Sequence, residues 1–532
     1  MLRIANFRVS IDDSTPLVQL VSRKLKIPQQ EICGVSINRK ALDARRKKNI
    51  CFVYSLDVRT TSFEKRILAK LGENRDVTLV DETIPEEELF CGKTLLDHPP
   101  VVIGFGPAGM LAALKLAEYG FRPLVLERGR NIDRRTQDVA NFWRTGNFDA
   151  VSNVQFGEGG AGTFSDGKLT TRVHDPRMRE VLELFVAAGA PAEICYHHKP
   201  HIGTDKLRSV VKNIRNKIIQ LGGQVEFESQ ITDLTIRNGK LLGITINGSQ
   251  EVPCNVVLAG IGHSARDTYQ MLYSRGVAME AKPFAIGVRI EHPQHIIDLA
   301  QYGSSAGHPA LGPADYALVY HSAGSGRTAY SFCMCPGGSV VAAASEDGGV
   351  VTNGMSLYNR NSGIANSALV VNVNAEDFGP GVLSGIEFQR HYEQLAYRLG
   401  GGNYSAPVQT VKNFLAGTVN HSKFLAKPSY RPGVTAADLR GCLPNFVSAT
   451  LAEALPAFNG KIKDFAHGDA VMTGVETRTS APVRILRATG GQSVNVSGLY
   501  PIGEGAGYAG GIMSAALDGL NAAISIIKEY QS

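Results

Sequence analysis

Hydrophobic positions change their spacing along this chain, and the changes mark where strands and helices alternate. The apolar run Val101–Ile103 predicts a buried strand, apolar residues at helical spacing predict a helix over Met110–Tyr119, and Leu124–Leu126 predicts a second strand. A strand, a helix and a strand in this order predict a βαβ unit with parallel strands.

A different pattern precedes this unit, because residues 1–95 read as short strands and helices and end at the linker Leu95–Pro100. They predict strands at Leu2–Ile11, Ile32–Asn38 and Ile50–Val58, and helices at Leu17–Leu25 and Phe63–Leu71. We expect a small N-terminal α+β domain. The basic cluster Arg45–Lys48 falls at its hairpin turn, where solvated surface is the simplest interpretation and contact with RNA or an acidic protein is the alternative.

Period-two alternation follows the βαβ unit and predicts a β-meander that returns to a buried strand at Val256–Ala259. Its strands are expected at Val225–Phe227, Ile231–Ile236 and Leu241–Ile246, with turns at Asn238-Gly239 and Asn247-Gly248. Near the C-terminus a strand is expected to end at Gly503-Glu504, and a glycine-rich turn opens a helix at about Gly511.

The intervening residues predict a β-rich α+β domain. Strands are expected within 283–294, 316–323, 327–338 and 339–346, and helices over Ile386–Gly400 and Pro444–Leu455.

The βαβ unit carries the glycine spacing of a dinucleotide fingerprint. Gly104 permits the tight turn, Gly106 lets backbone approach a pyrophosphate, and Gly109 permits close helix packing. The following helix start offers amide donors to phosphates. Glu127 ends the second strand, where a carboxylate accepts both ribose hydroxyls of an adenosine, and this disfavours NADP.

Composition and charge exclude several classes of protein. The 532 residues carry a formal net charge of +6, which suits an anionic cofactor but is too small to indicate nucleic-acid binding. No apolar run approaches eighteen residues, and the N-terminus does not have the layout of a signal peptide. Eight scattered cysteines fit reduced thiols, so we expect a cytoplasmic protein with no membrane span.

Several segments resemble a known family. They are "FGEGGAGTFSDGKL", "KPHIGTDKL", "SFCMCPGG", "ETRTSAPVRI" and "YPIGEGAGYAGGI". They resemble the bacterial uncharacterised FAD-dependent dehydrogenases, or NAD(FAD)-utilising dehydrogenases, within the two-dinucleotide-binding-domain flavoproteins, and the resemblance covers nearly the whole chain. It implies that Glu504 binds ribityl or pyrophosphate groups, that amides near Gly510, Gly511 and Ile512 face the flavin, and that Ile231 lies near the adenine.

Together these patterns predict an α/β fold, with a Rossmann-like FAD-binding domain, an inserted β-rich α+β substrate domain and the small N-terminal α+β domain. The expected domains are 1–95, 99–283 with 466–532 for FAD, and 284–465 for the substrate. FAD is expected to bind without a covalent link. The predicted cofactor-binding residues are Gly104, Gly106, Pro107, Ala108, Gly109, Glu127, Arg128, Gly160, Thr163, Ile231, Ala259, Gly260, Gly503, Glu504, Gly510, Gly511 and Ile512.

A second glycine pattern, "GIGHSA" at Gly260–Ala265, competes with this interpretation. With Glu280 downstream it could form a separate NAD(P) site. We favour passage of Ala259, Gly260 and Gly262 along the FAD, with Arg266 starting the next helix. NAD(P)H would then act only as a transient reductant, without a dedicated domain.

Three residues are candidates for catalysis: Lys168, Arg478 and His201. A cation beside the flavin can hold a carboxylate or stabilise negative charge. The alternative for the two cations is pairing with a local acid such as Asp166 or Glu476, and for His201 a structural hydrogen bond.

Cysteine and histidine clusters indicate no metal. Cys333 and Cys335 could be redox-active, although buried structural thiols are the simpler interpretation. "CYHHKPH", Cys195–His201, would splay its ligands to opposite faces of a strand.

The sequence therefore predicts an FAD-dependent oxidoreductase that transfers hydride between flavin N5 and an unidentified, possibly anionic, small molecule. Two alternatives stay open: a flavoprotein that acts on RNA through its basic N-terminal domain, and a non-catalytic FAD-binding protein. The substrate, the electron partner and the oligomeric state are not determined by the sequence.

Overall fold

The computed structural model describes residues 1–61, 63–72, 74–81, 89–420 and 423–532, which fall into two compact units. The first unit joins the N-terminal segment, which ends before residue 89, to Pro191–Pro200 and Asp298–Ala314. The second unit takes Leu89–Ala190, His201–Ile297 and Asp315–Ser532.

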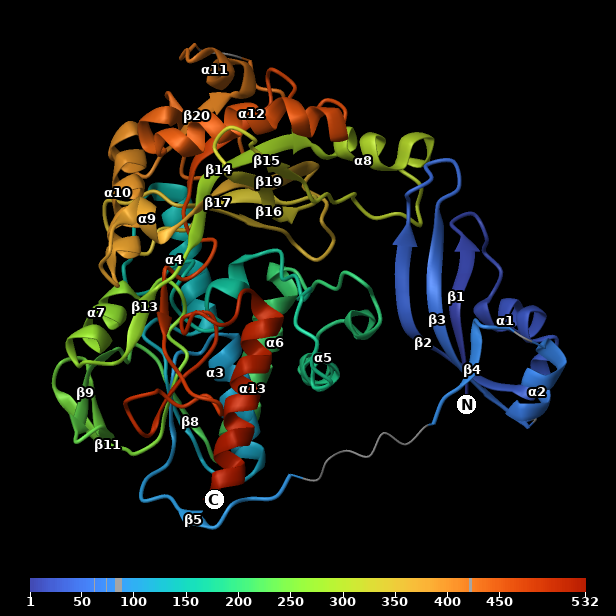
Figure 1. Cartoon of the computed structure of the whole chain (residues 1–532), viewed down its shortest axis with the longest axis horizontal. Coiled ribbons are helices and arrows are strands. Elements are labelled where there is room, and N and C mark those ends of the chain that lie inside the picture. The colour runs from blue at the N-terminus through green and yellow to red at the C-terminus, as the bar shows by residue number, and fades with distance from the viewer. Residues whose placement is uncertain (62, 73, 82–88, 421–422) are drawn as a thin grey trace. The chain divides into compact units, whose positions relative to one another are not determined.

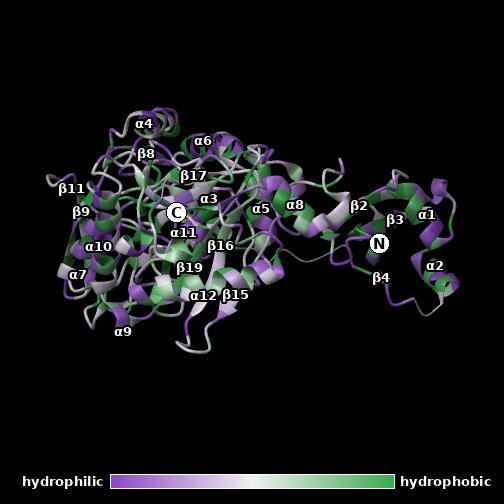
Figure 2. Ribbon diagram, turned by 90° about the horizontal axis from the view of Figure 1, so that it is seen from above, coloured by the Kyte–Doolittle hydropathy of each residue, from purple (hydrophilic) through white to green (hydrophobic). Residues whose placement is uncertain are grey.

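The first unit is built on an antiparallel sheet with strand order β2-β3-β1-β4. Its elements are β1 (Leu2–Ser10), α1 (Leu17–Leu25), β2 (Ile32–Asp43), β3 (Cys51–Thr60), α2 (Glu64–Leu71) and β4 (Val77–Leu79). Both helices carry hydrophobic and hydrophilic stretches (Figure 2), and Val21, Leu25 and Ile67 join the apolar core of the sheet. The predicted α+β pattern is confirmed. Arg45–Lys48 do form the β2–β3 turn, in which Arg45 pairs with Asp43 at 2.7 Å.

A parallel sheet with order β24-β12-β6-β7-β8 organises one part of the second unit. Its strands and two of its helices are β6 (Val101–Ile103), α3 (Pro107–Glu118), β7 (Leu124–Leu126), β8 (Gln224–Glu226), β12 (Val257–Ala259), β24 (Leu499–Pro501) and α13 (Ile512–Glu529). The predicted βαβ unit is confirmed. Helices α3 and α13 lie side by side although their sequences are about 400 residues apart (Figure 1). The C-terminal segment therefore completes the sheet that the fingerprint begins.

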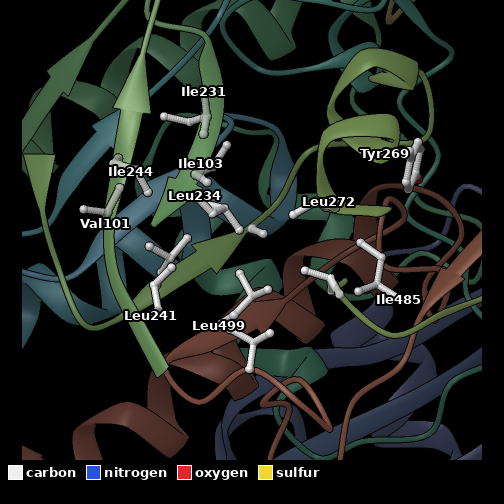
Figure 3. Close-up of a cluster of buried hydrophobic side chains, with 14 of the residues drawn as sticks. Val101, Ile103, Ile231, Leu234, Leu241, Ile244, Tyr269, Leu272, Ile485 and Leu499 are labelled. Atoms are coloured by element: carbon white, nitrogen blue, oxygen red, sulfur yellow. The ribbon is translucent and has the colours of Figure 1, made fainter. Parts of the chain in front are cut away.

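The predicted meander exists, but with a different first strand. Its antiparallel strands are β9 (Ile231–Arg237), β10 (Lys240–Ile246) and β11 (Gln250–Pro253). The turn residues Asn238 and Asn247 have φ of 50°, which explains the Asn-Gly sequence. The segment placed first in the meander, near Val225, is instead β8 of the parallel sheet, because the helix before it returns the chain parallel to β7. Figure 3 shows Ile231, Leu234, Leu241 and Ile244 of the meander packed with Val101 and Leu499 of the parallel sheet.

The inserted region forms a seven-stranded sheet with order β15-β16-β19-β14-β22-β20-β21. Its strands and larger helices are β14 (Phe284–Pro293), β15 (Val319–His321), β16 (Thr328–Cys335), β19 (Ile364–Val373), α10 (Ser384–Leu399), β20 (Ala406–Thr410), β21 (Val434–Ala436), α12 (Asn445–Lys461) and β22 (Val471–Glu476). Since β22 pairs with β14 and β20, residues 471–476 belong to this sheet and not to the FAD-binding part that was predicted to resume at 466.

The remaining elements connect these sheets. They are β5 (Thr94–Leu95), α4 (Ile132–Thr145), α5 (Met178–Ala187), α6 (Thr204–Gln220), α7 (Arg266–Ser274), β13 (Met279–Ala281), α8 (Gln294–Tyr302), β17 (Ser339–Ala342), β18 (Thr352–Met355), α9 (Ala375–Phe378), α11 (Val411–Ala416), β23 (Val483–Ile485) and β25 (Tyr530–Gln531). β13 pairs antiparallel with β23 outside the parallel sheet, so "GIGHSA" does not open a second βαβ unit, and Arg266 does begin the next helix. Across the described ranges, we found no helix with the length and hydropathy of a membrane span.

Close packing of α3 on α13 generates the first prediction. A Cβ added at Gly519 would lie 2.0 Å from the carbonyl oxygen of Ala108, so Gly519→Ala must push the helices apart. We expect it to lower the free energy of unfolding by about 1–3 kcal/mol, the usual cost of overpacking. Thermal and urea unfolding would measure the change.

Gly460→Ala is the matched control, because this residue of α12 is exposed and an added Cβ meets nothing within 4 Å. Alanine is favoured over glycine by about 1 kcal/mol inside a helix and by less at Gly460, the second-last residue of α12, so the control should be neutral or slightly stabilised. Equal stability of the two variants would contradict the packing described for α3 and α13.

Candidate cofactor and active site

A cavity of about 420 Å³ lies at the carboxyl edge of the parallel sheet. Glycine-rich segments from widely separated parts of the chain meet in its wall. The predicted residues that line it are Gly104, Gly106, Pro107, Ala108, Glu127, Arg128, Gly160, Lys168, Ile231, Gly260, Arg478, Gly503, Glu504, Gly510, Gly511 and Ile512. Four predicted residues, Gly109, Thr163, Ala259 and His201, lie outside this lining set. The carboxyl edge of a parallel sheet is where ligands bind in folds of this kind.

The fingerprint glycines are required by close backbone approaches. Gly104 has φ of +86°, and a Cβ there would lie 2.4 Å from the carbonyl oxygen of Gly260. A Cβ at Gly109 would lie 1.9 Å from the carbonyl oxygen of Gly104, which confirms the predicted close packing of the helix on its turn. A Cβ at Gly106 would meet only the Cα of Gly160, at 3.8 Å, so this position faces the cavity.

The wall has the open space and the amide donors that a flavin dinucleotide needs. Gly262, Gly510 and Gly511 border open space, since a Cβ on any of them meets no atom of the described chain within 4 Å. Helix α3 begins at Pro107 and helix α13 at Ile512, and both starts line the cavity. Two helix N-termini provide amide donors and positive dipole ends, which suit a pyrophosphate and the electron-rich edge of a flavin. The residues present therefore fit FAD.

Glu127 has more partners than the sequence indicated. Its Oε1 accepts the amides of Gly129 and Gly157 at 2.9 and 3.0 Å, and its Oε2 accepts the amide of Phe105 at 2.8 Å. The carboxylate thus ties the fingerprint loop to the glycine-rich loop around Gly157. Its contact with ribose stays a prediction, which the remaining acceptor capacity of Oε2 leaves room for.

Arg135 supports the wall of the cavity from behind its lining, and sequence reasoning missed this role. Its fully buried guanidinium donates to the carbonyl oxygens of residues 153, 154, 157, 158 and 160 at 2.6 to 3.2 Å. Burial lowers the pKa of Arg135 to about 10, so it stays charged at neutral pH. The signal was present in the helix pattern, because Arg135 shares the apolar face of α4 with Ile132 and Val139.

Lys168 and Arg478 both line the cavity but differ in how they are held. Lys168 Nζ lies 3.9 Å from Asp166, as the pairing alternative predicted, and its side chain is 29% exposed. Arg478 is buried and donates to both carboxylate oxygens of Glu393 at 2.8 and 3.0 Å. Glu476, named above as its potential partner, instead pairs with Arg289 at 3.1 Å. Lys168 is therefore the more available of the two cations.

Arg478 also belongs to a buried network. Its Nη1 and Nη2 donate to the hydroxyls of Ser264 and Ser345 at 2.8 and 3.0 Å, and Glu393 accepts from Arg266 at 2.8 and 2.9 Å as well. The charges of both arginines, hydrogen-bonded to it, hold the pKa of Glu393 at about 2 in spite of its burial. This network stiffens one wall of the cavity.

His201 has the structural role that the sequence left as its alternative. Its Nε2 donates to the carbonyl oxygen of Tyr358 at 2.9 Å, and its ring stacks on that tyrosine at 5.5 Å. Burial lowers the pKa of His201. A catalytic role for it finds no support in this geometry.

Glu504 is an acidic residue of the cavity lining. Burial raises its pKa to about 7, while the amide of Gly511 and the charge of Lys282 act in the other direction.

Several lining residues were not among the predicted site residues: Gln155, Phe156, Ser229, Gln230, His263, Ser264, Thr268, Phe332, Cys333, Asn353 and Thr479. Among the residues that the structure describes, no three His, Cys, Asp or Glu side chains are arranged to hold a metal.

Comparisons with known proteins address the cofactor. Residues 283–479 match the family model of the FAD-dependent protein C-terminal domain, and residues 1–59 match a domain of unknown function. An uncharacterised protein of Clostridium beijerinckii is 50% identical over 531 residues, 99% of each chain.

Solved structures give more distant likenesses. A geranylgeranyl bacteriochlorophyll reductase-like protein of Thermoplasma acidophilum has 13% identity and a TM-score of 0.34, covering 81% of this chain and 78% of its own. A flavin-dependent brominase has 14% identity and a TM-score of 0.35, covering 80% and 79%. Likenesses this remote carry no argument about activity.

The lining of the cavity and the match of residues 283–479 to the FAD-dependent protein C-terminal domain agree that FAD is the cofactor, and the 50% identity over the full length shows that the chain belongs to the family of the Clostridium beijerinckii protein.

Proposed function

We propose that this protein is an FAD-dependent oxidoreductase that transfers hydride between the flavin and a small, anionic substrate. The observation that carries the proposal is the composition of the cavity wall. The parallel sheet contributes the glycine-rich turns, while the inserted region contributes Phe332 and Cys333 from β16 and Asn353 from β18 to the same cavity. A site that only bound a nucleotide would not need the lining residues from the inserted region.

FAD, when bound, supplies a hydride acceptor or donor at its ring. The protein's own residues would hold it, with the α3 start toward the pyrophosphate and Glu504 and the α13 start toward the ribityl chain and ring. The inserted sheet would cover the remaining opening and exclude water, which strengthens electrostatic contacts inside the cavity.

Lys168 is the residue we propose for substrate binding. Its ammonium is partly exposed in the cavity, and the nearest acid, Asp166, is already engaged by Arg360 through two hydrogen bonds, at 3.1 and 2.5 Å. Asp166 therefore neutralises Lys168 only in part. A substrate carboxylate or enolate oxygen would complete the coordination of the ammonium.

Further proposals concern the binding of FAD, the role of NAD(P)H, the compartment and RNA. FAD binds without a covalent link, and NAD(P)H acts at most as a transient reductant, because the described chain has no second βαβ unit at Gly260–Ala265. The cysteines of the described chain form no disulfide, which supports a reducing, cytoplasmic setting. Arg45 in the basic turn is paired with Asp43, which lowers the positive charge that this turn offers to RNA.

The first test concerns the cofactor. We expect a yellow protein that releases FAD on heating or acidification, and we expect Gly510→Val to weaken FAD binding tenfold or more, because its side chain enters open cavity space. Absorbance at the flavin band and fluorescence titration of apoprotein measure both effects.

Gly312→Val is the control, since this glycine is also exposed with open space around it and lies outside the cavity lining. A colourless protein that refuses added FAD, or equal affinity in both variants, would rule out the site. Bound nucleic acid after purification would favour the RNA alternative.

The second test separates the two cations. Lys168→Ala should lower kcat/KM roughly ten- to hundredfold while FAD is retained, the effect of one lost charge-assisted contact of about 1.5–3 kcal/mol. Arg478→Ala should instead destabilise the fold by about 3–5 kcal/mol, because it breaks a buried ion pair. Anaerobic stopped-flow screening of metabolite pools for flavin bleaching or reoxidation would supply the substrate.

Lys212→Ala is the control for Lys168, because the side chain of Lys212 is 44% exposed, pairs with Asp133 and is not part of the cavity lining. Unchanged turnover in Lys168→Ala would place substrate binding elsewhere, and loss of FAD in that variant would assign Lys168 to the cofactor.

A further inference from the structure

Cys333 and Cys335 stand out because the proposed function does not use them. Cys333 lines the cavity beside Phe332, whereas Cys335 is fully buried behind it. The one S–H of Cys335 is shared between the Cys333 thiol and the carbonyl oxygen of Cys333, which lies 3.2 Å from Cys335 Sγ. One thiol is therefore accessible from the cavity, and the second is in contact with the first.

The backbone is specially arranged at this point. The pairing of β16 with β19 shifts register between Phe332 and Cys335, and Cys333 has φ of +45°, a left-handed conformation that is uncommon for cysteine. Bulges next to active sites re-aim side chains. The bulge therefore turns Cys333 toward the cavity and breaks the regular strand alternation.

A buried arginine holds the bulge in place. Arg289 donates to the carbonyl oxygen of Cys333 at 2.6 Å and contacts Cys335 Sγ at 3.9 Å, while Glu476 at 3.1 Å and Asn366 at 3.1 Å accept its other donors. Arg289 is fully buried. This arrangement places a fixed positive charge beside both sulfur atoms.

The electrostatics separate the two thiols. The hydrogen bond from Cys335, and then the charges of Arg289 and Lys168, lower the pKa of Cys333 to about 6 in spite of its burial. The pKa of Cys335 is raised, because it donates that hydrogen bond and is buried. An accessible thiolate next to a protonated, buried partner is the arrangement of an attacking and a resolving cysteine.

We propose that Cys333 and Cys335 form a redox-active dithiol that exchanges an electron pair with the FAD of the same cavity. This inference rests on the proposed function for its electron partner. When the dithiol is oxidised, two S–H bonds break, one S–S bond forms, and the two electrons and two protons released pass to oxidised FAD. In the reverse direction, reduced FAD returns them and the disulfide opens. A chain with one FAD would then store four electrons.

Thiol counting tests the pair without any assay of turnover. Purified protein is oxidised with diamide, denatured, alkylated with N-ethylmaleimide and weighed intact, and FAD content is read from the same sample. In wild type, Cys333 and Cys335 should escape alkylation, so that six of the eight cysteines are alkylated. The peptide that contains both should be two hydrogen atoms lighter than its reduced, unalkylated form. Cys335→Ser has seven cysteines, and all seven should be alkylated. The control Cys33→Ser, at an exposed thiol, should fall from seven sites to five.

Anaerobic titration with dithionite tests the exchange of electrons. Diamide-treated, desalted wild type should take up four electrons for each FAD, and Cys335→Ser should take up two with an unchanged flavin spectrum. Eight alkylated thiols after diamide, or two electrons per FAD in wild type, would overturn the proposal. If Cys335→Ser does not fold, the wild-type peptide mass and titration still decide. A colourless protein that forms the disulfide would refute the proposed function and the exchange with FAD, but not the pair.

Discussion

The cavity depends above all on one buried cation that satisfies the carbonyl groups of a glycine-rich loop. Arg135 donates to five carbonyl oxygens between residues 153 and 160, a segment whose glycines at 157, 159 and 160 adopt positive φ. Such a loop cannot satisfy its carbonyl groups in a helix or sheet, and buried carbonyl groups without partners are costly. A planar guanidinium with five donors meets this need from one position.

Glu127 provides hydrogen-bond acceptors for backbone amides, just as Arg135 provides donors for backbone carbonyl groups. It accepts N–H donors from the fingerprint loop, from its own turn and from Gly157, so the two loops that border the cavity are joined through one carboxylate. Residues of opposite charge therefore hold the same glycine-rich segment from two sides. The glycines provide the space for a cofactor, and the two charged side chains give that space a defined shape.

A second charged group joins the FAD-binding sheet region to the inserted domain. Glu393 of α10 accepts from Arg266, which begins α7, and from Arg478, which follows β22. Removal of one partner would leave buried charge uncompensated, which costs far more than a surface pair. The same logic applies to Arg289 and Glu476 beneath the Cys333 bulge. Buried polar contacts thus set the position of the inserted sheet beside the cavity.

The sequence alone determined the local elements and the nucleotide fingerprint, because strand length, helical spacing and glycine turns depend on neighbours within a few residues. It predicted β6, α3, β7 and the Asn-Gly turns, and it identified Lys168 as a cation of the cavity. Tertiary structure decided which charges pair. Glu393 lies 85 residues before Arg478, and β8 and β22 join sheets other than those predicted. Long-range partners leave no period in the sequence, so only the folded chain could reveal that Arg135 donates to five carbonyl groups of residues 153–160 and that Cys333 faces the cavity.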